Sequence, residues 1–147
     1  MTTLKDEYIL NSEAEMKELA RNMAKAGFRR VALSGPLGAG KTVFAKGFFS
    51  FFGISEEDII SPSFTIVNEY KLAEKIYAHI DLYRYQRFID DFGFWELAER
   101  ADAMLVEWAE KIGISNGPFD LIIEINSGKL GHPEGRTVKV KKNLTKQ

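Results

Sequence analysis

The chain has 147 residues, 45% of them apolar and 28% charged, which is typical of one globular domain with a real hydrophobic core. Its net charge of −1 excludes the strong basic field that draws proteins to nucleic acid or anionic membranes, and the absence of cysteine excludes disulfides and thiolate metal sites. The first residues form no signal peptide and no apolar run approaches membrane-spanning length, so we expect a single cytoplasmic domain, 1–147, without membrane association.

The first predicted elements are a short strand that ends at residues 8–10 and a helix that follows it. Ser12 and Glu15 form a Ser-x-x-Glu capping box, the usual start of a helix. Apolar residues then recur at helical spacing until Gly27, which is typical of a helix end. The apolar run 30–34 predicts a buried strand, and apolar residues at helical spacing over 42–49 predict a second helix.

A complete phosphate-binding pattern, G-x-x-x-x-G-K-[ST], stands between that strand and that helix. Backbone amides of such a loop point at phosphate oxygens, and the following helix presents its positive N-terminal end to the same anion. We expect Lys41 to bind the β- and γ-phosphates and the Thr42 hydroxyl to bind Mg²⁺. A plain glycine-rich turn, the alternative, has no use for Lys-Thr at these positions. The nucleotide-binding residues predicted here are Gly35, Pro36, Leu37, Gly38, Ala39, Gly40, Lys41, Thr42 and Val43.

The rest of the chain is dominated by predicted strands. Residues 59–70 begin as a loop and become a strand, residues 75–82 form its hairpin partner, and 101–108 and 120–125 each contain a further strand. Residues 136–141 alternate polar and apolar side chains, which we interpret as an edge strand. Strands on both sides of a loop–helix unit, together with hairpins, predict an α/β fold with a mixed sheet.

Three carboxylates follow apolar strand residues and are candidates to steer the metal: Asp81, Glu107 and Glu124. Open α/β sheets bind ligands at the carboxyl ends of their strands, and Mg²⁺ prefers oxygen ligands. Periodicity does not rank the three, and any of them can simply mark the return of a strand to solvent. A second polar cluster, residues 61–65 (SPSFT), offers hydroxyls to phosphate or to the metal's water shell, or is a serine-rich turn that enters a strand.

Four segments, in this order and in so short a chain, resemble the TsaE (YjeE) family: 35–42, 61–70 (SPSFTIVNEY), 79–84 (HIDLYR) and 106–108 (VEW). The resemblance spans residues 12–110, and its specificity lies in the set. It implies a P-loop NTPase-like three-layer fold whose mixed central sheet carries added antiparallel strands. It also implies a slow ATPase that uses ATP and Mg²⁺ and is needed for threonylcarbamoyladenosine on tRNA. The implied partners are the TsaB and TsaD proteins, with tRNA reached indirectly through their complex.

The resemblance also implies roles for single residues. Lys41, Glu107 and Asp81 match the catalytic set, and Thr42 joins the two carboxylates at the metal. A loop that senses the γ-phosphate contains Ser61, Ser63 and Thr65, and Trp108 matches an aromatic residue beside the nucleotide.

Three positions depart from the family pattern, because the family usually has threonine at Ser63, an acidic residue at Pro36 and often a second hydroxyl residue at Val43. The first keeps its hydroxyl, and none removes an indispensable part of the mechanism. Two other functions stay open: a small-molecule kinase, which would need a lid that the sequence does not display, and a nucleotide-gated binding module with vestigial hydrolysis.

Overall fold

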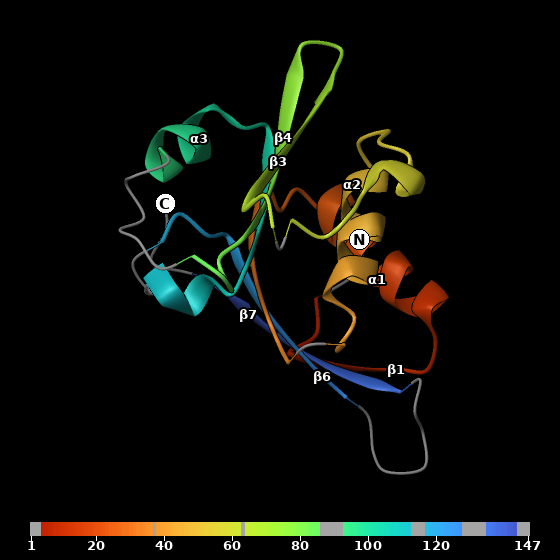
Figure 1. The fold of residues 1–147 in the computed structure, drawn as a ribbon. Coiled ribbons are helices and arrows are strands. Elements are labelled where there is room, and N and C mark those ends of the chain that lie inside the picture. Colours follow the sequence, from red (N-terminus) through yellow and green to blue (C-terminus); the bar gives the residue numbers. More distant parts are fainter. Residues whose placement is uncertain are drawn as a thin grey trace.

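The computed structural model describes residues 4–36, 38–62, 64–85, 93–112, 117–127 and 135–143 (Figure 1). Within these residues the strands form one seven-stranded sheet in the order β1-β7-β6-β2-β5-β4-β3. The strands are β1 (Glu7–Leu10), β2 (Arg30–Ser34), β3 (Val67–Leu72), β4 (Lys75–Asp81), β5 (Ala103–Glu107), β6 (Leu121–Ser127) and β7 (Arg136–Lys142). The helices are α1 (Glu13–Lys25), α2 (Lys41–Ser50), α3 (Phe94–Arg100) and the short 3₁₀ turns η1 (Glu56–Asp58) and η3 (Ala109–Ile112).

The sheet is mixed, as the sequence predicted. Its centre is parallel, because β2 pairs with both β5 and β6, and β5 pairs with β4. Its two sides are antiparallel, with β3 on β4 at one side and β7 between β6 and β1 at the other. The carboxyl ends of the parallel strands therefore meet at one edge of the sheet, where open α/β sheets bind ligands.

Helices cover both faces of the sheet and make a three-layer arrangement. Helices α1 and α2 lie on one face, and α3 lies on the other (Figure 1). The apolar strands β2 and β5 send alternate side chains into the two cores: Leu33 and Leu105 face α1 and α2, whereas Ala32 and Met104 face α3. Burial on both faces explains why these strands are continuous apolar runs.

Residues 136–141 do not form an edge strand, and that prediction was wrong. Strand β7 lies between β1 and β6, and the sheet edges within the described residues are β1 and β3. The alternation arises because Val138 and Val140 are buried beneath the helices while Lys139 and Lys141 are exposed on the opposite face. A strand with one solvated face has this pattern at any place in a sheet.

Over the parts of the chain that the structure describes, no helix combines the length and apolar character needed to span a membrane.

Candidate functional site

The phosphate-binding pattern forms the turn between β2 and α2, as predicted. Gly35, Gly38 and Gly40 have φ values of 146°, 79° and 111°, which side chains rarely permit. At Gly35 space is also lacking, because an added Cβ would lie 2.3 Å from the carbonyl oxygen of Ile125. The turn therefore depends on glycine for both conformation and room. Leu37 lies outside the described residues.

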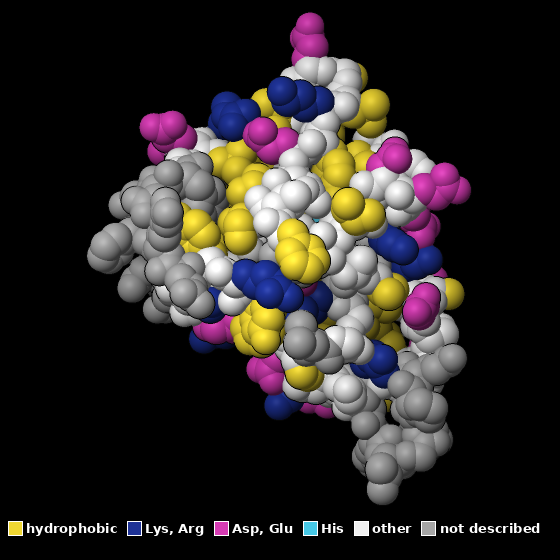
Figure 2. Space-filling view, in the orientation of Figure 1, with side chains coloured by type: hydrophobic (Ala, Val, Ile, Leu, Met, Phe, Trp, Pro, Cys, Tyr) yellow, Lys and Arg dark blue, Asp and Glu magenta, His cyan; other side chains and the backbone are white. Residues whose placement is uncertain are grey.

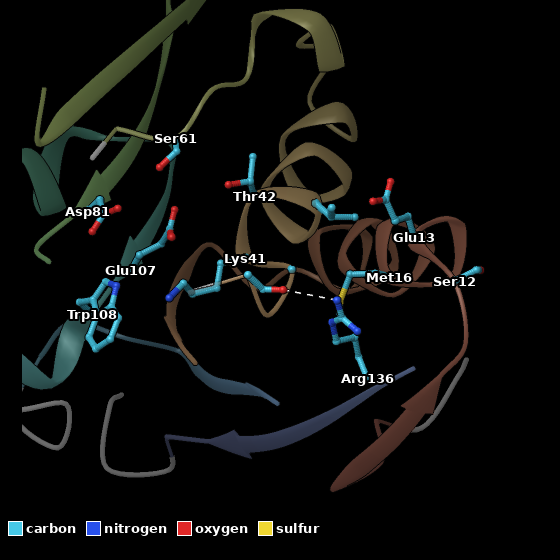
Figure 3. A pocket seen from close by; sticks show the side chains of 13 residues that line it. Ser12, Glu13, Met16, Lys41, Thr42, Ser61, Asp81, Glu107, Trp108 and Arg136 are labelled. Carbon is cyan, nitrogen blue, oxygen red and sulfur yellow. Dashed lines mark hydrogen bonds between the residues drawn. The ribbon is translucent and has the colours of Figure 1, made fainter. Parts of the chain in front are cut away.

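An open cavity of about 390 Å³ lies at the carboxyl edge of the central strands, in front of this turn (Figure 3). Its volume falls in the usual range for small-molecule sites. It brings together residues from six separate parts of the chain, including most of the predicted site. The predicted residues that line it are Gly38, Gly40, Lys41, Thr42, Val43, Ser61, Asp81, Glu107 and Trp108.

Four further predicted residues that the structure describes lie outside the lining of the cavity. Gly35, Pro36 and Ala39 contribute backbone to the turn behind it, where the amide of Ala39 donates to the Pro36 carbonyl at 3.1 Å. Thr65 is exposed and donates its hydroxyl to Asn68 at 2.7 Å, away from the cavity. Ser63 lies outside the described residues.

Glu124 is separated from the other two candidate carboxylates. It is exposed on β6, does not line the cavity, and accepts a hydrogen bond from Asn126 at 2.8 Å. Asp81 and Glu107 end neighbouring strands, both line the cavity, and each is only 3% exposed. The structure thus distinguishes among candidates that the sequence left equal.

Lys41 is buried at the start of α2, with 6% of its surface exposed. Its Nζ donates to the carbonyl of Gly35 and lies 4.4 Å from the ring centroid of Trp108 (Figure 3). Burial lowers the pKa of Lys41, and the nearby carboxylates of Glu107 and Asp81 offset part of this shift. This buried ammonium lies at the start of α2, where the end of a helix favours an anion.

The two carboxylates have different hydrogen-bond partners. The backbone amide of Tyr83 donates to Asp81 Oδ1 at 2.9 Å. His79 lies two residues before Asp81 on β4, and its Nε2 is 2.7 Å from Glu107 Oε2. His79 is fully buried, and its contact with Glu107 was not predicted from the sequence.

Trp108, directly after Glu107, has a backbone φ of 59°. This left-handed conformation is unusual for a bulky residue, and such strain tends to occur at functional sites. The Trp108 amide donates to the Leu33 carbonyl at 3.1 Å, and its ring lies 4.9 Å from that of Tyr83. These contacts hold the indole at the mouth of the cavity, over Lys41.

Four lining residues were not predicted as site residues: Ser12, Glu13, Met16 and Arg136. Ser12 caps α1 by accepting from the amide of Glu15 at 3.2 Å, which is how the sequence had explained it. Arg136 begins β7 and donates to the carbonyls of Ala39 at 2.8 Å and Gly38 at 3.3 Å. Nothing in the local sequence around Arg136 indicates this role.

The oxygen atoms around the cavity suit Mg²⁺ only when a ligand brings further oxygens. Among the described residues there is no group of three or more His, Cys, Asp or Glu side chains arranged to hold a metal. Thr42, Asp81 and Glu107 nevertheless supply one hydroxyl and two buried carboxylates to one cavity. Mg²⁺ is commonly held by one or two carboxylates together with substrate phosphates, so this donor set fits it.

Comparisons with known proteins agree with this geometry. Residues 10–137 match the family model described as threonylcarbamoyl adenosine biosynthesis protein TsaE. The chain is similar to the tRNA threonylcarbamoyladenosine biosynthesis protein TsaE of Aquifex aeolicus, with 37% identity over 81% of this chain and 85% of that one. The protein of the same name from Rickettsia conorii is 38% identical over 71% of this chain and 62% of its own length.

The Bacillus subtilis protein of that name is 42% identical, over 56% of this chain and 51% of its own length. The chain therefore spans most of the Aquifex relative but less than two thirds of the Rickettsia conorii and Bacillus subtilis proteins. Among solved structures, Bacillus subtilis YdiB is similar, with a TM-score of 0.72 and 26% identity over 99% of this chain and 90% of that one. This likeness agrees with the predicted α/β fold and its mixed sheet.

Proposed function

This chain belongs to the TsaE family, and we propose that it binds ATP with Mg²⁺ and hydrolyses it slowly in the formation of threonylcarbamoyladenosine on tRNA. One observation carries the proposal: the glycine turn, the buried ammonium of Lys41 and the carboxylates of Asp81 and Glu107 line one cavity. A cation and two carboxylates are costly to bury, so their collection around a phosphate-binding turn favours a ligand that uses all of them.

The polyphosphate would lie on the backbone amides between β2 and α2, at the positive end of α2. Lys41 would exchange the Gly35 carbonyl for phosphate oxygens, and the Thr42 hydroxyl would face the metal. Thr42, Asp81 and Glu107 would hold Mg²⁺, which would supply positive charge against the charge that develops in the transition state. Asp81 and Glu107 would orient the water whose oxygen attacks the γ-phosphorus, as the bond to ADP breaks and inorganic phosphate leaves.

We attribute the proposed slow turnover to the positions of the arginines. Of the described residues that line the cavity, Arg136 is the sole arginine, and its guanidinium is bound to carbonyls of the turn. The guanidinium of Arg84 lies 4.8 Å from the ring centroid of Phe64. Phosphoryl transfer without an arginine at the γ-phosphate is typically slow until a partner supplies the missing charge.

Segment 61–65 connects the nucleotide to a surface. Ser61 lines the cavity, whereas Phe64 is 85% exposed and Ile60 is 62% exposed. Figure 2 shows hydrophobic side chains beside Lys and Arg at the centre of one face of the molecule. Contact between the γ-phosphate and Ser61 would order the segment, and loss of phosphate would release it.

We assign this surface to the TsaB and TsaD proteins, which would act with the chain in the cytoplasm. The exposed side chains of Phe64 and Ile60 support the assignment, and a surface that rearranged with each hydrolysis would suit a partner that must bind and be released in cycles. Co-purification of the chain with TsaB and TsaD, with and without ATP, tests it. Equal recovery under the two conditions would contradict a nucleotide-dependent contact.

Release of phosphate from ATP by purified protein, with and without TsaB and TsaD, tests the central proposal. We expect Lys41→Ala to reduce this rate by at least about 10²-fold, as losses of single transition-state contacts do. Lys46→Ala is the matched control, since Lys46 lies farther along α2 and does not line the cavity. Unchanged hydrolysis in Lys41→Ala would reject the site, and phosphate transfer to an added metabolite would favour a kinase.

A further inference from the structure

His79 is a polar residue in a place where apolar side chains normally pack. It is fully buried on β4, on the side of the sheet that faces α2, and its ring centroid lies 5.6 Å from that of Phe49. A leucine or methionine would fill such a position without the cost of burying polar nitrogens. The observation that distinguishes His79 is its contact with Glu107, whose Oε2 lies 2.7 Å from Nε2.

The surroundings of the imidazole select one tautomer. Nδ1 is buried and has no hydrogen-bond partner within the described chain. A proton on Nδ1 would be a buried donor left unpaired, and Nε2 would then face the carboxylate with a lone pair. With the proton on Nε2, the imidazole donates to Glu107 Oε2, and only a weak acceptor is left without a partner. The Nε2–H form is therefore the stable one.

This hydrogen bond restricts a flexible side chain. A glutamate has several rotatable bonds, and holding it in one rotamer costs conformational entropy. Glu107 lies at the end of β5 and is 3% exposed, with His79 behind it and the cavity in front. The bond occupies Oε2 and leaves Oε1 for the ligand side of the site. Buried partners that hold metal-ligating carboxylates in this way commonly affect metal affinity and rate.

We propose that His79 is a positioning residue, which holds the carboxylate of Glu107 through Nε2–H in the orientation that metal and attacking water require. The inference rests on the proposed function, because Glu107, which His79 would position, lines the proposed nucleotide site. It predicts that His79 influences metal binding and turnover through Glu107, without contact with the nucleotide. A packing role alone predicts an effect on stability and none that depends on Glu107.

Two substitutions of similar volume separate these roles. His79→Gln places an amide donor near the position of Nε2, whereas His79→Leu fills the space without a donor. We expect His79→Leu to weaken Mn²⁺ binding in the presence of ATP, measured by electron paramagnetic resonance, and to lower kcat, each by about 10- to 100-fold. We expect His79→Gln to recover most of both losses, and KM for ATP to change little in either variant.

A double-mutant cycle tests the route through Glu107. In a Glu107→Gln background, replacement of His79 by leucine should cause almost no further loss of kcat, because the carboxylate that it positions is already absent. Equal further losses in the two backgrounds would overturn the proposal. Thermal unfolding of each variant shows whether a loss comes from the fold, and His79→Gln, which keeps the donor, remains informative if His79→Leu is unstable.

A nucleotide-free measurement separates this inference from the proposed function. Imidazole ¹⁵N chemical shifts of the wild-type protein should display the Nε2–H tautomer of His79, with a shift change in Glu107→Met. An Nδ1–H tautomer would overturn the inference. Wild-type protein that neither hydrolyses ATP nor binds Mn²⁺ with nucleotide would reject the proposed function, whereas wild-type activity retained in His79→Leu would reject the role of His79 alone.

Discussion

Asp81 stands directly opposite Glu107 across the parallel pair of β4 and β5, and both side chains line the cavity (Figure 3). Two buried carboxylates at neighbouring strand ends repel one another, and a nearby cation reduces this repulsion. Lys41 lines the same cavity, and the carboxylate of Glu107 offsets the lowering of its pKa by burial more than that of Asp81 does. Glu107 also lies 2.7 Å from Nε2 of His79. Asp81 instead accepts from the Tyr83 amide at 2.9 Å, so the two carboxylates are not interchangeable.

Neutral isosteres should separate their roles. We expect Glu107→Gln to lower kcat by at least about 10²-fold, because a neutral amide no longer orients water or metal as the carboxylate would. Asp81→Asn keeps a side-chain oxygen for the Tyr83 amide, so its main effect should be a higher Mg²⁺ concentration for half-maximal rate. Rates measured against Mg²⁺ concentration provide both numbers.

The matched control is Glu124→Gln, on strand β6 and outside the cavity, which should hydrolyse ATP at the wild-type rate. A larger kcat loss in Asp81→Asn than in Glu107→Gln would reverse the assignment.

Arg136 should matter for nucleotide affinity. Its guanidinium binds the carbonyls of Ala39 and Gly38, which orients the peptide groups whose amides would face phosphate. Removal of a hydrogen bond to a charged group costs about 1.5–3 kcal/mol, so Arg136→Ala should weaken ATP binding by roughly 10- to 100-fold in calorimetry. Arg136→Lys keeps the charge without the planar fork and should recover only part of the loss. Full affinity in Arg136→Ala would show that the turn keeps its shape unaided.

Gly47 should be required for the packing of α2 against α1. An added Cβ at this position would lie 2.3 Å from the carbonyl oxygen of Lys17 and 2.6 Å from its Cα. Gly47→Ala would stabilise an open helix by about 1 kcal/mol, but here the overlap should destabilise the fold by about 1–3 kcal/mol. Chemical denaturation shows directly whether Gly47→Ala raises or lowers the free energy of unfolding. Lys46→Ala, one residue earlier, should have a small effect, and a stabilising Gly47→Ala would contradict the close approach.

The sequence predicted the parts of the site that depend on residues close together in the chain, and it missed contacts between residues far apart in the chain. The glycine turn was predictable because its conformation depends on glycines at fixed offsets within eight residues. Asp81 and Glu107 could be named as strand-end carboxylates, but the exclusion of Glu124 required the structure, in which its side chain is exposed outside the cavity. Arg136 is 97 residues from Ala39, and His79 is 28 residues from Glu107, so no local pattern reports either contact.

The fold shows the same division. Strands and helices with a clear period were found close to their observed bounds. Helix α3 was not anticipated because it has only seven residues, and it begins after Gly93, whose φ of 76° is left-handed. Strand β7 was wrongly predicted to be an edge strand. Alternation of polar and apolar side chains shows which face of a strand is buried, but it does not show whether other strands pair with it on both sides. Tertiary pairing, and not local propensity, decided these elements.

The ion pair between Lys17 and Glu56 should make stability depend on acid pH. Their side chains are 2.7 Å apart and connect α1 to η1, and the hydrogen bond from Lys17 lowers the pKa of Glu56 below its ordinary value of 4.5. A folded-state pKa below the unfolded value means that the pair stabilises fully above about 4.5 and loses this effect as the pH falls through the folded-state pKa.

Both partners are partly exposed, so the effect should be only about 0.2–1 kcal/mol. Denaturation of Glu56→Gln at pH 7 and at pH 3 checks the sign. The variant should be less stable than wild type at pH 7, and the difference should shrink at pH 3. Glu57→Gln, at the exposed neighbouring position, serves as the control. A difference that grows on acidification would contradict the pair.

Trp108 should report nucleotide binding. The Nζ of Lys41 lies 4.4 Å from its ring centroid, and phosphate would draw the ammonium away from the indole. The chain has two tryptophans, so Trp95→Phe isolates the emission of Trp108. We expect titration with ATP and Mg²⁺ to change this emission. In a Lys41→Ala background, only direct quenching by nucleotide should persist, because no cation remains to be displaced. Calorimetry shows whether each protein binds ATP. If both bind it and ATP changes the emission equally with Lys41 and in the Lys41→Ala background, the ammonium does not leave the ring when phosphate binds.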